Sequence, residues 1–121
     1  MELSTYYICL LRKGPKWTSE ETSEPDELQA RHMEHIRSLV ASGAKIAAGP
    51  VEDASDIRGF SIFRTATLAE ARALAEADPA VQAGRFIVEL HPWRTPAGGV
   101  LPPPMSGSAV GGSGSGGPMH W

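Results

Sequence analysis

The chain has 121 residues, a formal net charge of −3, and contents of 41% apolar and 21% charged residues. This length allows one domain, and the apolar content excludes a wholly disordered chain. The slightly acidic balance argues against a nucleic-acid-binding protein, and no apolar run approaches the roughly 20 residues that a membrane span needs. The single cysteine, Cys9, cannot form an internal disulfide, so we expect a protein of the reducing cytoplasm.

The composition changes sharply near Thr95. All 11 basic and all 14 acidic residues lie at or before Arg94, whereas 8 of the 13 glycines and 5 of the 10 prolines lie beyond it. Glycine loses the most backbone entropy on ordering, and consecutive prolines cannot join a sheet. We therefore predict a domain over residues 1–94 and a flexible tail over residues 95–121. The tail ends in three bulky residues, Met119, His120 and Trp121.

The first part of the domain reads as a strand followed by a helix. Residues 4–12 (STYYICLLR) are rich in aromatic and β-branched side chains, and both faces of this predicted strand are apolar. The segment Ser23-Glu24-Pro25-Asp26 is typical of a helix start, with a serine cap and a proline in the first turn. We expect the helix to run to about Ser42 and to stop at Gly43. Its apolar stripe contains Leu28, His32, Ile36, Leu39 and Val40.

The second part of the domain predicts three more strands and a second helix. The capping box Thr67-Leu68-Ala69-Glu70 begins this helix, which runs to Ala77 and ends at Asp78-Pro79. The predicted strands are residues 45–48, closed by Gly49-Pro50, residues 59–64, and residues 85–91, closed by Pro92-Trp93.

The resulting order, βαββαβ, predicts a ferredoxin-like α+β fold, with two helices on one face of an antiparallel sheet. Two helices cannot cover both faces of the sheet, although both faces of the first strand are apolar. A second copy of the same sheet is the simplest cover. We therefore expect a homodimer.

His32 and Asp78 are the leading candidates for chemistry. His32 lies in the middle of an apolar stripe, where burying an imidazole without a partner costs free energy. The topology packs the two helices antiparallel, which brings Asp78, just past the second helix, close to the helix that bears His32. A carboxylate beside an imidazole fixes its tautomer and favours proton transfer near neutral pH. The alternative is a buried pair that only holds the two helices together.

Other candidates have simpler explanations. A metal site could be argued from His32, His35 and His91, but no further ligand completes a known spacing. We expect neither a metal nor another cofactor. Cys9 lies among apolar neighbours and is expected to be an inert packing residue. The aromatic residues, Tyr6, Phe60 and Trp93 among them, are most simply core or dimer contacts, although one could line a pocket. Phosphate-loop, serine-elbow and zinc-protease motifs do not occur in the sequence.

Several short segments, in this order and spacing, resemble the YCII-related domain family of small bacterial proteins. They are Leu10-Leu11-Arg12-Lys13-Gly14-Pro15, Leu28-Gln29-Ala30-Arg31-His32-Met33, Ala48-Gly49-Pro50, Arg58-Gly59-Phe60, Glu70-Ala71, residues 77–85 and His91-Pro92-Trp93. The resemblance covers nearly all of residues 3–94 and none of the tail.

The resemblance implies a dimeric α/β barrel with a His–Asp pair in a pocket, and that pair falls on His32 and Asp78. One activity of the family is dehydrochlorination of a chlorinated hydroxyquinol, an elimination driven by proton transfer. Members often carry an arginine three residues before the histidine. Here Gln29 stands at that position and Arg31 is adjacent to the histidine instead.

The leading hypothesis is a cofactor-independent lyase or isomerase acting on a small aromatic or oxygenated molecule. His32 would move the proton, Asp78 would orient the imidazole, and Arg31, Tyr6, Phe60 and Trp93 would contact the substrate. The alternative is a binding or carrier module whose tail presents Met119, His120 and Trp121 to a modifying enzyme, as in a ribosomal peptide precursor. The Gly/Ser-rich tail could equally be a plain linker.

Overall fold

Four strands and three helices make up the described part of the chain. The structure is a computed structural model that describes residues 3–18 and 26–96. The elements are β1 (Leu3–Lys13), α1 (Asp26–Ala41), β2 (Lys45–Pro50), β3 (Ile57–Phe63), α2 (Leu68–Glu76), α3 (Pro79–Gln82) and β4 (Phe86–Pro96). The predicted cap at Ser23 and the predicted tail beyond Pro96 lie outside the described residues.

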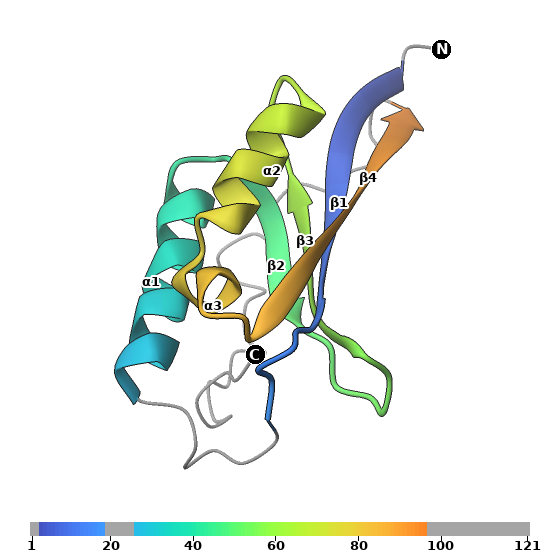
Figure 1. Cartoon of the computed structure of the whole chain (residues 1–121). Helices are drawn as coiled ribbons and strands as arrows, with labels where there is room; N and C mark the ends of the chain where they lie inside the picture. The colour runs from blue at the N-terminus through green and yellow to red at the C-terminus, as the bar shows by residue number, and fades with distance from the viewer. Residues whose placement is uncertain (1–2, 19–25, 97–121) are drawn as a thin grey trace, which may run out of the picture.

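The strands form one antiparallel sheet in the order β2-β3-β1-β4, and all helices lie on one face of it (Figure 1). β1 is central and pairs along its full length with β4, from Leu3 opposite Pro96 to Lys13 opposite Phe86. This arrangement confirms the ferredoxin-like α+β fold. The element that sequence analysis missed is α3, a single turn of helix directly after α2.

Local chemistry fixes the helix ends. The Thr67 side chain accepts a hydrogen bond from the backbone N–H of Glu70, so the predicted cap of α2 is present. Gly43 has φ of +86°, a left-handed conformation that favours glycine, just after α1 ends. None of the described helices is long and apolar enough to span a bilayer.

Two predicted strand ends were wrong. Pro50 lies within β2 opposite Gly59, and Pro92 lies within β4 opposite Tyr7. Both are edge strands, where a proline can face outward without removing a hydrogen bond from the sheet. The two prolines therefore continue their strands, and β4 ends two residues beyond the predicted domain boundary at Arg94.

The core lies between the sheet and the helices. Alternate residues of β1, namely Tyr7, Cys9 and Leu11, are buried there against the helices. The other buried apolar residues are Ile36, Leu39, Phe63, Ala71, Ala75, Ala80, Phe86 and Leu90. Val40, predicted to belong to the stripe of α1, is exposed instead. It lies about 80° around the helix from His32, and this places it beyond the edge of the contact with the sheet.

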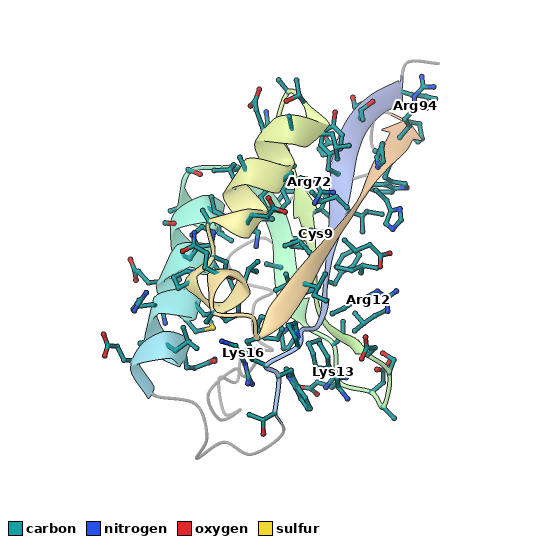
Figure 2. All side chains as sticks on the ribbon, in the orientation of Figure 1. Cys9, Arg12, Lys13, Lys16, Arg72 and Arg94 are labelled. Atoms are coloured by element: carbon teal, nitrogen blue, oxygen red, sulfur yellow. The ribbon has the colours of Figure 1, made fainter. Side chains whose placement is uncertain are left out.

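The opposite face of the sheet carries none of the described helices. Tyr6, Ile8 and Leu10 of β1 lie on this open face and are half-buried among their strand neighbours. Phe60 of β3 and Ile87 of β4 are exposed on the same face. Arg12 also lies on this side of the sheet, away from the helices (Figure 2). The open face therefore presents apolar side chains that no described helix covers.

Candidate active site

The middle of α1 places an imidazole in the interior. His32 faces the sheet together with Ile36 and Leu39, and it is 0% exposed. Its ring centroid lies 5.4 Å from that of Phe86, the first residue of β4, and the two planes meet at 43°. An imidazole in such surroundings requires a polar partner, because a buried polar group without one costs free energy.

Asp78 supplies this partner. One of its carboxylate oxygens, Oδ2, lies 2.6 Å from Nδ1 of His32, and the other, Oδ1, accepts the backbone N–H of Ala80 at 2.8 Å. Asp78 is the N-cap of α3, with Pro79 at the first helical position, so this short helix fixes the carboxylate. The residue is 3% exposed. The contact expected between these two residues, 46 positions apart in sequence, is therefore present.

The direction of this hydrogen bond determines what the imidazole can do. An ionised carboxylate is only an acceptor, so beside an ionised Asp78 the ring proton lies on Nδ1 of His32, and the Nδ1–H group donates the hydrogen bond. The lone pair of the neutral ring is then on Nε2. A proton taken up at Nε2 forms an imidazolium that the carboxylate stabilises. The arrangement is suited to a general base that later returns the proton as a general acid.

A lysine shares the same interior. Lys45, the first residue of β2, is 6% exposed and lies opposite Phe63 on the helix side of the sheet. Its Nζ is 5.0 Å from the centre of the Phe63 ring. Burial lowers the pKa of Lys45, while the charges of Cys9 and Asp78 act in the opposite direction. Of the acidic residues, Asp78 is the one whose charge acts on Lys45.

Cys9 lies in the same layer, between the helices and the sheet (Figure 2). It is opposite Ser61 on β3. Burial raises the pKa of the Cys9 thiol, and the positive charge of Lys45 and a hydrogen bond with Ser61 oppose this only in part. A raised pKa keeps the sulfur protonated and unreactive near neutral pH.

The aromatic residues proposed to contact a substrate do not lie beside His32. Tyr6, Phe60 and Trp93 are on the open face, where the Tyr6 and Trp93 rings are 6.2 Å apart. The sheet separates them from the buried pair within one chain. Arg31 is exposed on α1. Met119, His120 and Trp121 lie outside the described residues.

The three histidines considered as a metal site are held apart. Nε2 of His35 is 2.9 Å from the carbonyl oxygen of Leu74 on α2. Nε2 of His91 is 2.6 Å from Oε2 of Glu89, on the open face of the sheet and thus on the far side from His32. Within residues 3–18 and 26–96, no three histidine, cysteine or acidic side chains gather as metal ligands.

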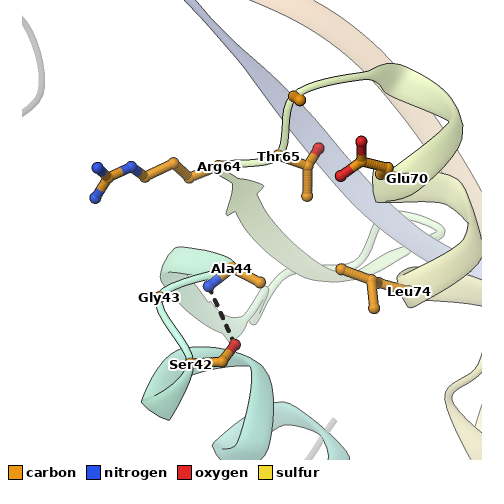
Figure 3. Close-up of a pocket in the computed structure, with 8 residues that line it drawn as sticks. Ser42, Gly43, Ala44, Arg64, Thr65, Glu70 and Leu74 are labelled. Atoms are coloured by element: carbon orange, nitrogen blue, oxygen red, sulfur yellow. Dashed lines mark hydrogen bonds between the residues drawn. The ribbon is translucent and has the colours of Figure 1, made fainter.

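An open hollow of about 490 Å³ lies where α1 ends (Figure 3). It is lined by Ser42, Gly43, Ala44, Arg64, Thr65, Ala66, Glu70 and Leu74. Ser42 is ten residues beyond His32, which corresponds to roughly 15 Å along a helix. None of the residues that sequence analysis proposed for the site lines this hollow, so we do not assign it to the His32–Asp78 pair.

The structure defines a ferredoxin-like α+β protein with a histidine–aspartate pair buried in the core between the helices and the sheet. The family model of the YCII-related domain matches residues 5–94, and the chain belongs to this family. None of the curated proteins searched matches the chain.

One similar solved structure is that of 5-chloro-2-hydroxyhydroquinone dehydrochlorinase (TftG) from Burkholderia phenoliruptrix AC1100, in complex with 2,5-dihydroxybenzoquinone. The two chains are 22% identical, and the match has a TM-score of 0.50. It covers 80% of this chain and 100% of the other. This likeness shows the fold.

Sequence reasoning missed Lys45, and the structure shows why. The pairing of β2 with β3 shifts by one residue between Lys45 and Ala47. Lys45 lies opposite Phe63, on the helix side, whereas Ala47 lies opposite Ile62, on the open face. In a regular strand these two positions would share a face, so simple alternation does not place Lys45. The available signal was a lysine at the start of an otherwise uncharged strand.

Proposed function

We propose that this chain is a small-molecule enzyme that uses the His32–Asp78 pair for proton transfer in a lyase or isomerase reaction. The main support is the 2.6 Å contact between the two side chains, both of which are buried between the helices and the sheet. The backbone N–H of Ala80 in α3 holds one oxygen of the Asp78 carboxylate, and the His32 imidazole contacts the other. Such fixed geometry is what general acid–base catalysis needs.

In the proposed step, Nε2 of neutral His32 takes a proton from a carbon or oxygen acid of the substrate. In an elimination, the electrons of the broken C–H bond form a double bond, and the leaving group departs with its own bonding pair. Asp78 stabilises the imidazolium meanwhile. His32 then releases the proton to the leaving group or to water; in an isomerisation it returns the proton to another atom of the same molecule.

The substrate class we propose is a small oxygenated ring. The structural neighbour is named as a dehydrochlorinase of a chlorinated hydroxyhydroquinone and was solved with a dihydroxybenzoquinone. Arg31, next to His32 in the sequence, is exposed and is the proposed contact for an anionic oxygen of such a ring.

We also propose a homodimer formed through the open face. Tyr6, Ile8 and Leu10 lie there on one strand and Phe60 on the next. A second copy would cover this face by the same self-complementary contact on both sides. Tyr6, Phe60 and Trp93 would then act as contacts between subunits rather than as contacts of a ligand beside His32.

The competing role for the pair is purely structural, because both side chains are buried. An absorbance assay of the full chain with hydroxylated and chlorinated hydroquinones as substrates distinguishes the catalytic role from the structural one. We expect His32→Gln to abolish turnover and Asp78→Asn to lower it by at least about tenfold, with the helical circular-dichroism signal retained.

His35→Gln is the matched control. His35 lies three residues away on the same helix and bonds a carbonyl oxygen rather than a carboxylate, so its loss should leave turnover unchanged. Full activity in His32→Gln would contradict the proposed role of the pair. A wild-type protein that neither converts nor binds any compound of the panel would contradict the substrate class.

A further inference from the structure

Two cations lie over the Trp17 indole, at the end of the sheet where β1 ends and β4 begins (Figure 2). Nζ of Lys13, the last residue of β1, is 4.4 Å from the centre of the Trp17 ring, and the guanidinium carbon of Arg85 is 5.9 Å from it. Arg85 also lies over the ring of Phe86, at 5.4 Å, and Phe86 is opposite Lys13 in the sheet. We call Lys13, Trp17, Arg85 and Phe86 the indole cluster.

The backbone holds Trp17 in this position. The N–H of Gly14 donates to the carbonyl oxygen of Arg85 at 2.7 Å, and the N–H of Lys16 donates to that of Gly84 at 2.9 Å. A Cβ at Gly14 would lie 2.4 Å from the Gly84 carbonyl oxygen, so glycine is needed for the two segments to come this close. The chain after β1 is thereby tied to the start of β4, and the fold fixes the place of the indole.

The indole cluster is in contact with the His32–Asp78 pair. The rings of Phe86 and His32 have their centroids 5.4 Å apart. The first turn of α1 lies at the same end of the fold as the start of β4 (Figure 1), and Gln29 is in this turn. It precedes His32 by three residues, about 60° around the helix. The pair is buried, whereas Gln29 and Trp17 are half-buried, so this group of side chains extends from the pair to the surface.

Two hydrogen-bond donors at this end have no acceptor among the described residues. They are Nε1 of Trp17 and the amide Nε2 of Gln29, and both nitrogen atoms are buried. Buried donors without a partner cost free energy and are rare in folded proteins. Oxygen atoms of a bound molecule would satisfy them. Because Lys13 and Arg85 bring positive charge to the same place, an anionic molecule fits it better than a neutral one.

We propose that Trp17 and Gln29 donate hydrogen bonds to the oxygens of a small anionic ring that lies beside His32. Lys13 and Arg85 supply the charge that favours an anion, and Phe86 supplies an apolar contact for the ring. This inference rests on the proposed function and deepens it, because it names groups besides Arg31 that recognise the substrate. Binding can nevertheless be measured without turnover.

The test compares 2,5-dihydroxybenzoquinone, which is anionic at neutral pH, with resorcinol, which is neutral, as ligands of the full chain. Calorimetry gives the affinities, and NMR follows the side-chain N–H signals of Trp17 and Gln29. We expect the anion to bind more tightly than resorcinol and to move both signals. Trp17→Phe and Gln29→Met each remove a donor and should weaken binding of the anion by about tenfold or more. A wild type that binds neither ring, or binds both equally, would overturn the proposal.

Gln82→Met is the matched control, because it removes the same amide from an exposed residue at the end of α3 and should leave the affinity unchanged. Gln29→Met should not lower the melting temperature of the unliganded chain, since the lost donor has no partner there. A lower melting temperature with unchanged affinity would show that Gln29 only supports the fold, and would overturn the proposal.

The wild type decides the question if a variant does not fold, because N–H signals that stay in place at saturation with the anion would also overturn the proposal. Failure of the proposed function has a different signature. If the anion binds through Trp17 and Gln29 while His32→Gln keeps full turnover, the proposed role of the pair is wrong and the binding site stands.

Discussion

The two faces of the sheet place polar groups in opposite ways. On the helix side, His32, Asp78 and Lys45 are buried, and the imidazole and the carboxylate are held by one short contact. On the open face, Arg12, Glu89 and His91 form a chain of ion pairs among apolar neighbours, and their side chains remain at least one-third exposed. Charges cost far more to bury than to leave at a surface. The covered face is therefore where a fixed charge arrangement suggests chemistry, and the open face is where a partner surface is expected.

The sharpest test of this comparison uses two phenylalanines on β3. Phe63 points to the helix side and is 0% exposed, whereas Phe60 points to the open face and is 37% exposed. We expect Phe63→Ala to lower the free energy of unfolding by about 3–5 kcal/mol, because it leaves a cavity in the core. Urea denaturation at several protein concentrations measures this. A loss below about 1 kcal/mol would contradict the division into a covered and an open face.

Asp78→Asn tests the polar half of the covered face. The amide keeps an oxygen that can cap α3, but it loses the charge that holds Nδ1 of His32. We expect a loss of about 1.5–3 kcal/mol, the range for a hydrogen bond to a charged group, by the same denaturation. A loss below about 0.5 kcal/mol would show that the charge of Asp78 does not stabilise the fold.

Phe60→Ala tests whether the open face of the sheet is a contact between subunits. If a second copy covers the open face, removing this ring should weaken the dimer by about tenfold while changing the stability of the isolated fold much less than Phe63→Ala does. Sedimentation equilibrium of both variants and the wild type gives the dissociation constants. A wild type that stays monomeric at high concentration would contradict the homodimer. A Phe60→Ala protein that dimerises normally would show that Phe60 is not part of the interface.

The sequence alone predicted the features that capping, periodicity and topology determine together. The order βαββαβ, the cap at Thr67, the stop at Gly43 and the meeting of His32 with Asp78 all follow from periodicity and capping rules. The errors arise where tertiary context decides. We predicted that two strands end at prolines, because the sequence does not show which strands lie at the edges of the sheet.

Lys45 and α3 were missed for related reasons. A one-residue shift in strand pairing turns Lys45 inward, and such a shift has no signature in residue type. The turn Pro79–Gln82 is too short for its pattern to be recognised as a helix, although Asp78-Pro79 carries the chemistry of a helix start. The candidate pair was therefore predictable, but the burial of Lys45 was not.

The smallest expected effect belongs to the ion pairs of the open face. Hydrogen bonds from Arg12 and His91 hold the pKa of the Glu89 carboxyl below its usual value. A carboxyl with a lowered pKa stabilises the fold at pH values above its unfolded pKa, and this contribution is lost as the pH falls through its folded pKa. Glu89→Gln should therefore lower the melting temperature slightly at neutral pH, and the difference from wild type should shrink on acidification.

Melting curves of the two proteins between neutral and strongly acidic pH measure this, and they should be repeated in high salt, which screens exposed charges. A difference that persists at the lowest pH would mean that Glu89 contributes through packing rather than charge. Glu89→Gln could instead cause a large drop in melting temperature at neutral pH that disappears in a Phe60→Ala background, where the subunits are already separated. That result would place Glu89 inside the dimer contact. Burial there would strengthen its bonds to Arg12 and His91 beyond what an exposed pair provides.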